Sequence, residues 1–354
     1  MADDLVCRKK TEEERWIMKS VFLIMLCAAS FAVCARDNSL TGETIDMYGV
    51  FTVDDELCVG RPDDEEPKRI THGWPDYKPS WSPDGKWIVF FRIVSGKKLT
   101  IPEWKTKICV IRPDGTDLRE LTDGAHNDLN PTWTRDGKNN VIINRCDTGT
   151  SRIYFSTVES KPGEEALVSD PAYVEFAHCG MKDGRMLIMT TRNSDKYRAY
   201  YFSQGDNGLY FPPFVQLLTP EPGKIGKYES LGFDQRIMML PNRVSLSPDE
   251  TKIVFERDDS FDPLGFAGHP LVVADFNYRE AAVRNMKTFY DTPFYEYALY
   301  PAWTRDSKGI IYFGSFAPLK MKLYVYDSGD GNIRRLSPCK FAAFKYYCGY
   351  GAPK

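Results

Sequence analysis

The chain has 354 residues, which is enough for two ordinary domains or for one large all-β domain. Its apolar content is 42%, so a buried core is expected and a disordered chain is not. The formal net charge is −3 at pH 7, and the lysine and arginine residues are scattered along the sequence. The charge therefore gives no reason to expect nucleic acid or an anionic membrane surface as a partner.

The N-terminus has the pattern of an export signal. Met18 and Lys19 form a charged start, residues 21–33 are apolar, and small residues follow up to a cleavage point after Ala35. The apolar stretch is short for a bilayer span, which needs about 20 residues. We therefore predict a cleaved signal peptide, an exported mature chain in the periplasm or outside the cell, and no stable membrane span in the mature form.

These boundaries predict a signal peptide over residues 1–35, a short linker over 36–44 and a folded domain over 45–354. The first 17 residues precede Met18 and read as an extended start or as a start codon placed too early. An uncleaved anchor, or a lipid on Cys27 or Cys34, is the alternative. Neither cysteine follows a small residue, so a cleaved signal is preferred.

One phrase recurs through the rest of the chain. It reads PSWSPDGKWIVF at 79–90, PTWTRDGKNNVII at 131–143, SLSPDETKIVF at 245–255 and PAWTRDSKGIIYF at 301–313, with a weaker copy near 175. A period of about 50 residues indicates a solenoid, a propeller or an array. The strands are short, and the continuously apolar run at 87–91 predicts a strand covered on both faces, as in propeller blades.

The repetition changes how its polar residues are interpreted. The recurring aspartates are Asp84, Asp136, Asp249 and Asp306. Because a catalytic residue is needed once, these four are predicted to hold tight turns, together with the Ser or Thr two positions earlier. The recurring tryptophans are Trp81, Trp133 and Trp303, and we predict that they pack between blades. A catalytic carboxylate and a ligand-stacking platform are the alternatives for these two sets.

The ends of the chain predict how the ring closes. Residues 56–71 match residues 107–122 at an offset of 51, so they supply outer strands of a blade that lacks its inner strands there. Residues 45–53 add a strand, and residues 344–350 begin one more unit. We predict an all-β fold: a six-bladed β-propeller of four-stranded antiparallel blades, closed by a blade shared between the N- and C-termini. A seventh blade would need a unit within residues 198–242.

Two stretches are longer than the repeat requires and are interpreted as loops. They are residues 193–242, which include Tyr210 and Phe211, and residues 258–270. Long loops on a regular scaffold often carry binding sites, although they can also be simple elaborations of the rim.

Known catalytic motifs are absent from the sequence: it contains no GxSxG, no phosphate-binding glycine loop and no HExxH. The four histidines, His72, His126, His178 and His269, have no metal-ligand spacing and are expected in loops or packing. His178 is the best candidate for the axial channel. Asp258 and Asp259 follow an inner strand, where they either face solvent or hold a cation.

The candidate binding residues are therefore His178, Tyr210, Phe211, Asp258, Asp259 and His269. No catalytic or metal-binding residue is assigned. No cofactor is expected, with a divalent cation in the channel as the alternative.

Six cysteines remain after cleavage, an even number that is compatible with disulfides in an oxidising compartment. Cys58 and Cys109 occupy the same place in successive repeats and are predicted to be small core residues. Cys339 and Cys348 are the best candidates for a disulfide.

The phrase P-x-W-[ST]-x-D-[GS]-K before an apolar strand resembles the repeat of TolB-type β-propellers, over residues 50–354. The resemblance implies a six-bladed periplasmic or secreted propeller. TolB itself has an α/β domain before its propeller, whereas residues 36–55 alone separate the predicted cleavage point from the first matched strand. The repeat is also similar to that of prolyl-oligopeptidase propellers, without their hydrolase domain, and of oligogalacturonate lyases, without their metal-binding histidines.

The preferred function is an exported, non-catalytic scaffold that binds a protein or glycan partner of the cell envelope through its loop-bearing face, as a monomer. The alternative is a carbohydrate-active lyase or hydrolase with its site at the axial channel. Carboxylates without counter-charges at the channel mouth would favour the enzyme.

Overall fold

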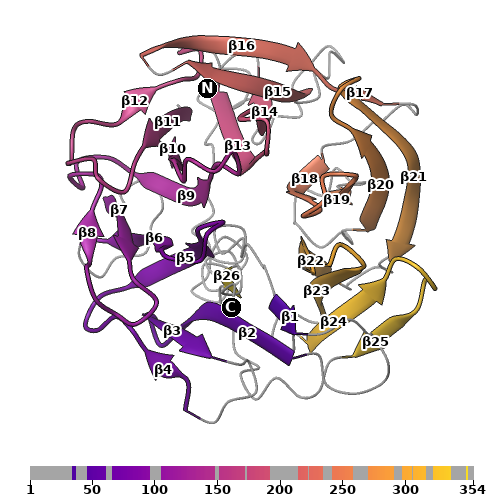
Figure 1. The fold of residues 1–354 in the computed structure, drawn as a ribbon, viewed down its shortest axis with the longest axis horizontal. Helices are drawn as coiled ribbons and strands as arrows, with labels where there is room; N and C mark the ends of the chain where they lie inside the picture. The colour runs from indigo at the N-terminus through magenta and orange to yellow at the C-terminus, as the bar shows by residue number, and fades with distance from the viewer. Residues whose placement is uncertain are drawn as a thin grey trace, which may run out of the picture.

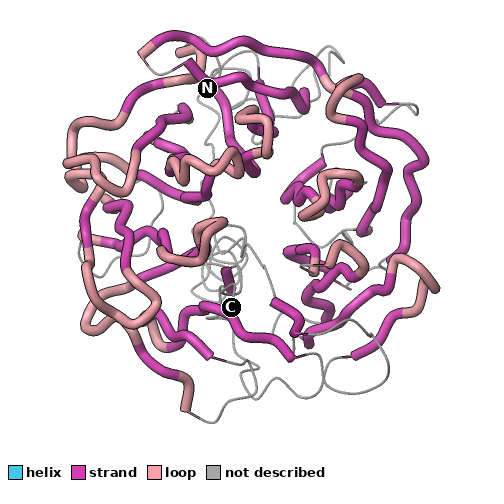
Figure 2. The backbone as a smooth tube through the Cα atoms, in the orientation of Figure 1, coloured by secondary structure: helices cyan, strands magenta, loops and turns pink. Residues whose placement is uncertain are grey.

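The computed structural model describes residues 34–36, 46–60, 66–95, 105–147, 151–171, 174–191, 214–221, 223–233, 241–257, 270–290, 297–304, 306–315, 322–335 and 348–349. All regular secondary structure in these ranges is β-strand (Figure 2). Nothing among the described residues forms a helix of the length and hydrophobicity that crossing a bilayer requires.

Six antiparallel sheets surround a central axis as the blades of a propeller (Figure 1). Blade 1 contains β2 (Asp46–Val53), β3 (Glu56–Gly60) and β4 (Lys68–Arg69), with β1 (Cys34–Arg36) and β26 (Cys348–Gly349) at one edge of β2. Blade 2 contains β5 (Asp76–Trp81), β6 (Ile88–Ile93), β7 (Thr106–Ile111) and β8 (Arg119–Glu120). Blade 3 contains β9 (Asp128–Trp133), β10 (Val141–Arg145), β11 (Arg152–Ser156) and β12 (Ala166–Leu167).

The other three blades follow in chain order. Blade 4 contains β13 (Val174–Gly180), β14 (Met186–Thr191), β15 (Phe214–Glu221) and β16 (Lys224–Ser230). Blade 5 contains β18 (Pro241–Leu246), β19 (Lys252–Arg257), β20 (Leu271–Asn277) and β21 (Ala282–Tyr290), with β17 (Gly232–Phe233) parallel to β21 at its outer edge. Blade 6 contains β22 (Tyr297–Trp303), β23 (Gly309–Ser315), β24 (Lys322–Asp327) and β25 (Ile333–Arg335).

Blade 1 closes the ring with strands from both ends of the chain, as the sequence predicts. Phe51 in β2 pairs with Cys58 of β3 on one side and with Cys348 of β26 on the other. The same edge of β2 also pairs with β1, where Cys34 lies opposite Tyr48. The first strand of this blade is therefore made of two short pieces from opposite ends of the sequence.

The first of these pieces overlaps the predicted processing point. Ala35, after which cleavage is expected, is the middle residue of β1. Removal of the signal there would take two of the three residues of β1 and leave β26 on that edge of β2.

The interpretation of residues 193–242 as one long loop is wrong for residues 214–233. These residues contain β15 and β16, which complete blade 4, and β17, which extends blade 5, so they do not form a seventh blade. The sequence KIGKYES of β16 hides this role because the strand lies at the outer edge of its blade and most of its side chains are exposed. An outer strand does not need the apolar pattern of a covered one.

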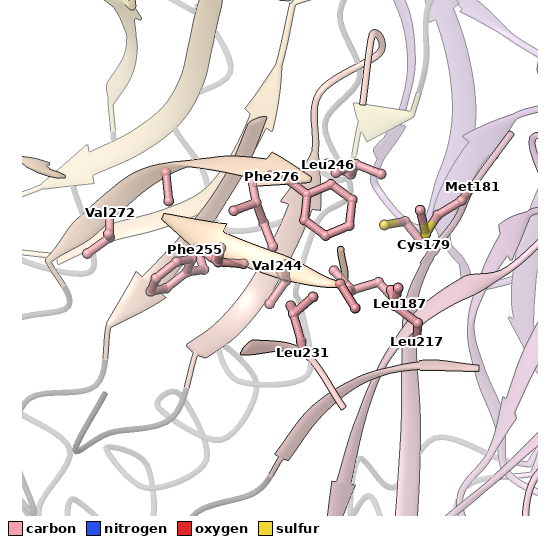
Figure 3. Packing of buried hydrophobic residues seen from close by; sticks show 14 residues of the cluster. Cys179, Met181, Leu187, Leu217, Leu231, Val244, Leu246, Phe255, Val272 and Phe276 are labelled. Atoms are coloured by element: carbon pink, nitrogen blue, oxygen red, sulfur yellow. The ribbon is translucent and has the colours of Figure 1, made fainter. Parts of the chain in front are cut away.

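The hydrophobic core lies between blades. Five clusters of buried side chains are described, each shared by two neighbouring blades. Figure 3 shows the cluster between blades 4 and 5, where Leu187 and Leu217 face Leu246 and Phe276. Strands covered on both faces explain the continuously apolar runs in the sequence. Cys58 and Cys109 are fully buried core residues, as predicted.

The repeated phrase forms the hairpin between the first and second strands of a blade. In blade 2, Ser82 Oγ donates a hydrogen bond to Asp84 Oδ1 (2.6 Å) and accepts one from the Trp87 N–H (2.9 Å). Asp84 also accepts a hydrogen bond from the Lys86 N–H (3.1 Å). Equivalent bonds to the turn aspartate occur at Asp136, Asp183, Asp249 and Asp306. The architectural interpretation of this aspartate is therefore confirmed.

The tryptophan of the phrase joins neighbouring blades, as predicted. Trp133 Nε1 donates to the carbonyl oxygen of Ser80 in blade 2 (2.9 Å), and Trp303 Nε1 donates to that of Ser245 in blade 5 (3.1 Å). Trp81 is equally buried, but its Nε1 has no partner among the described residues.

Candidate binding face

The strand directions give the ring two unlike faces. The hairpins of the repeated phrase and the turns between third and fourth strands lie at one end of every blade, which we call the turn face. The connections between second and third strands, and those between blades, lie at the other end, which we call the loop face. The longest connections, 192–213 and 258–270, join strand ends at the loop face.

The connection from β6 to β7 shows how a loop leaves this face. The Val94 N–H and the Ser95 N–H both donate to the carbonyl oxygen of Lys105 (2.9 and 3.3 Å), and the Lys105 N–H donates to Ser95 Oγ (2.9 Å). These bonds form a closed neck at the base of the connection.

The turn face brings charged groups of three blades together. Glu250, in the turn of blade 5, accepts a hydrogen bond from the Lys182 N–H of blade 4 (2.7 Å), and Arg135 of blade 3 donates to the carbonyl oxygen of Ser247 (3.4 Å). Burial raises the pKa of Glu250, against the effects of the Lys182 N–H and of Arg135. This buried carboxylate has basic neighbours and a hydrogen-bond donor, so it is not an uncompensated acid of the catalytic kind.

Trp74 is an exposed aromatic side chain of the loop face. It lies in the connection from β4 to β5 and is 48% exposed, and it is the one aromatic among the exposed large hydrophobic residues described. The guanidinium carbon of Arg92 lies 5.7 Å from the centroid of its ring. A large aromatic side chain kept at the surface over a fixed cation is typical of a contact residue.

His126 occupies the equivalent place in the next blade. Trp74 is two residues before Asp76, which begins β5, and His126 is two residues before Asp128, which begins β9. His126 Nδ1 lies 2.8 Å from Asp147 Oδ2, and both side chains are partly exposed. The backbone of His126 is also fixed, because its carbonyl oxygen accepts a hydrogen bond from the Thr106 N–H (2.9 Å).

A buried ion pair begins the inner strand that follows each of these two positions. Arg92 makes two hydrogen bonds to Asp76 (2.7 and 2.8 Å), and Arg145 makes two to Asp128 (2.7 and 3.1 Å). Arg145 also bonds Glu165 Oε1 (2.6 Å). Each pair joins the first and second strands of its blade at the loop face. Paired charges held this way are rigid, since breaking such a pair costs about 3–5 kcal/mol.

Among the residues predicted from the sequence, His178 is the one whose position is described. It lies in β13, the first strand of blade 4, at a bulge between Ala177 and Cys179. The residue is partly covered, yet its Nε2 is shielded from solvent and has no hydrogen-bond partner among the described residues. Burial lowers the pKa of His178 to about 4, so the imidazole is neutral at pH 7. The other predicted binding residues, Tyr210, Phe211, Asp258, Asp259 and His269, lie outside the described residues.

The sequence interpretation missed Trp74 and the pairing of His126 with Asp147. The sequence predicts a loop without a role for His126 and gives no signal in the repeated phrase for Trp74, because neither residue belongs to that phrase. A signal was nevertheless present, since the sequence HGWP at 72–75 places an aromatic between a glycine and a proline directly before an inner strand. No group of three or more His, Cys, Asp or Glu side chains in the described ranges is arranged to hold a metal ion.

Comparison with solved structures supports the fold. The chain is similar to TolB from Acinetobacter baumannii, with 15% identity and a TM-score of 0.56 over 86% of this chain and 66% of that protein. It is also similar to a putative TolB from Agrobacterium tumefaciens, with 12% identity and a TM-score of 0.53 over 82% of this chain and 88% of that one. The protein thus has the fold of a TolB-type six-bladed β-propeller.

A third similar structure is a puromycin-hydrolysing peptidase from Mycobacterium tuberculosis, with 12% identity and a TM-score of 0.53 over 87% of this chain and 44% of the peptidase. The chain therefore spans less than half of the peptidase and about two thirds of the Acinetobacter protein. No protein-family model and no curated protein sequence matches the chain. At these identities the likeness concerns the fold, and many unrelated functions share it.

Proposed function

We propose that the protein is an exported, non-catalytic scaffold whose loop face binds a protein or glycan partner of the cell envelope. The observation that carries this proposal is the position of Trp74. This aromatic side chain stands exposed over the fixed Arg92–Asp76 pair on the face to which the longest connections belong. Exposed aromatics on a rigid support are common in contact surfaces.

The turn face supports the same proposal from the other side. Its recurring carboxylates are used to close turns, and the buried carboxylate of Glu250 is bonded to the neighbouring blade with Arg135 close by. The competing enzyme hypothesis needs carboxylates without such counter-charges at the axial channel. Export is proposed from the pattern of residues 1–35.

A pull-down from the envelope fraction of the source cells, combined with a glycan array, tests the proposal. The bait is the mature protein, and the Trp74→Ala variant is the matched control. We expect the wild type to bind a protein or glycan without converting it chemically. The variant should not bind this ligand. Release of unsaturated or hydrolysed sugar products by the wild type would contradict the scaffold and support the enzyme.

A further inference from the structure

The backbone on both sides of Trp74 is fixed. The Gly73 N–H donates to Glu56 Oε1 (2.9 Å), and the carbonyl oxygen of Pro75 accepts a hydrogen bond from the Ile93 N–H (3.0 Å). Gly73 has a φ of +77°, a backbone conformation that residues with a side chain rarely adopt. This conformation lets the chain turn just before the indole. The backbone that carries the indole is therefore held in place before any ligand arrives, which lowers the entropy cost of binding.

Polar groups gather around Glu56, which bonds the backbone next to this ring. Arg69 bonds Glu56 Oε2 (2.9 Å) and approaches Asp54 (3.5 Å), and His72 Nδ1 lies 3.6 Å from Glu56 Oε2. The hydrogen bond from the Gly73 N–H, together with Arg69, holds the pKa of Glu56 below its usual range, although burial opposes this shift. We call these residues the rim cluster: Asp54, Glu56, Arg69, His72 and Trp74.

The rim cluster has a formal charge of −1, with His72 counted as neutral. Both carboxylates, Asp54 and Glu56, lie within 4 Å of the single guanidinium of Arg69, so the remaining negative charge disfavours an anionic ligand. Asp54 and His72 are nevertheless open to solvent, with side chains 69% and 73% exposed. The cluster can therefore bind a ligand through hydrogen-bond donors and acceptors and through one apolar ring face.

Among the described residues, Trp74 is the one exposed large hydrophobic side chain of the loop face. The other exposed large hydrophobic side chains described are Leu118, Ile225 and Ile333, and they belong to a turn of blade 2 and to the outer strands β16 and β25. A protein partner usually contacts an aromatic anchor at the centre of a wider desolvated patch. A single ring in polar surroundings instead matches a sugar, which has an apolar C–H face and a rim of hydroxyl groups.

We propose that the rim cluster is a subsite for one ring of a neutral glycan, which stacks on the indole of Trp74 and hydrogen-bonds through its hydroxyls to Asp54 and His72. This inference rests on the proposed function and names the ligand class of that face. Arg92 supports the indole from the protein side and does not contact the sugar.

Calorimetric titration of the full chain tests the subsite. The probes are maltotriose, cellotriose and triacetylchitotriose as neutral glycans, and trigalacturonic acid as a charged one. We expect at least one neutral trisaccharide to bind, the Trp74→Ala variant to bind it at least tenfold more weakly, and Trp74→Phe to retain part of the affinity. Leu118→Ala, which removes an exposed apolar side chain near the turn face, should bind as the wild type does.

Three results would overturn the proposal. They are binding of none of the neutral probes, binding that Trp74→Ala leaves unchanged, and preferential binding of trigalacturonic acid that weakens with added salt. Thermal unfolding of each variant checks its fold, and Trp74 is exposed enough for the ring to be removed without opening the core. If these probes fail while the pull-down still captures a protein in a Trp74-dependent way, the glycan subsite is wrong and the scaffold function stands.

Discussion

Glu250 Oε1 accepts a hydrogen bond from the backbone N–H of Lys182 (2.7 Å), so a side chain of blade 5 completes a turn of blade 4. Glu250 has a φ of +62°, in the turn position that is glycine in blades 2, 3 and 4. This turn therefore has a strained backbone and a buried carboxylate, and the same residue makes a contact between two blades.

The Glu250→Gln variant should be more stable than the wild type at neutral pH. Burial raises the pKa of Glu250 above its value in the unfolded chain, so its contribution to stability is complete below the unfolded pKa and is lost as the pH rises through the folded pKa. Glutamine keeps an acceptor for the Lys182 N–H without burying a charge. Urea unfolding from pH 4 to pH 8 measures the effect.

The difference in unfolding free energy between this variant and the wild type should grow from pH 4 to pH 8. A constant difference across that range would contradict the raised pKa. Asp249→Asn serves as the control, because hydrogen bonds from Ser247 and Thr251 outweigh burial and hold the pKa of Asp249 below its usual range. Between pH 5 and pH 8 the difference for this control should stay constant, because the contribution of Asp249 is complete above the unfolded pKa and is lost only as the pH falls through the folded pKa.

Two tryptophans at the same blade position predict a measurable difference. Trp133→Phe removes the hydrogen bond to Ser80, whereas Trp81→Phe removes an N–H that has no partner among the described residues. Both changes remove the same volume from nearly equally buried sites, so the packing cost should largely cancel. We expect Trp133→Phe to destabilise the fold by about 1 kcal/mol more than Trp81→Phe. Equal losses in chemical denaturation would show that the bond contributes nothing.

Gly180 is predicted to tolerate no side chain. A Cβ at this position would lie 2.6 Å from the carbonyl oxygen of Trp133 and 2.7 Å from Thr134 Cα, both backbone atoms of blade 3. Gly180→Ala should therefore push blades 3 and 4 apart and cost about 1–3 kcal/mol or more. Gly232→Ala is the control, since its nearest neighbour, the carbonyl oxygen of Ala281, is at an ordinary 3.6 Å. Equal melting temperatures for the two variants would contradict this geometry.

Tyr312→Phe should stabilise the protein. The ring of Tyr312 is fully buried and lies 5.7 Å from that of Tyr324, but its hydroxyl has no hydrogen-bond partner among the described residues. Removing the hydroxyl keeps the ring contacts and should raise stability by about 1 kcal/mol. Tyr77→Phe should do the reverse, because the Tyr77 hydroxyl donates to Asp55 (2.5 Å). A lower melting temperature for Tyr312→Phe would mean that its hydroxyl is paired in solution.

Features that recur in every blade could be predicted from the sequence, and features that occur in one blade only could not. Asp84 and its counterparts indicate a turn because each tight hairpin leaves backbone N–H groups that need an acceptor. The aspartate supplies this acceptor in successive blades. The match between residues 56–71 and 107–122 likewise located the closing blade. The outer strand β16 was missed because its exposed side chains carry no apolar pattern.

The candidate site was harder to predict for a related reason. Trp74 and His126 lie at equivalent positions in successive blades, but one is an indole and the other an imidazole, so no sequence similarity marks the position. Their environment is set by partners distant in the sequence, such as Arg92 beneath Trp74 and Asp147 beside His126. Such contacts appear only when the strands are paired.

The closed neck formed by Val94, Ser95 and Lys105 has a practical consequence for protein engineering. Because these backbone groups bond one another at the base of the connection, a foreign peptide could replace the intervening residues without transmitting tension to the ring. The same peptide placed in a hairpin of the repeated phrase would disrupt a turn that its own side chains hold shut. The molecule thus offers one side for display of grafted epitopes and one side that an engineer should leave intact.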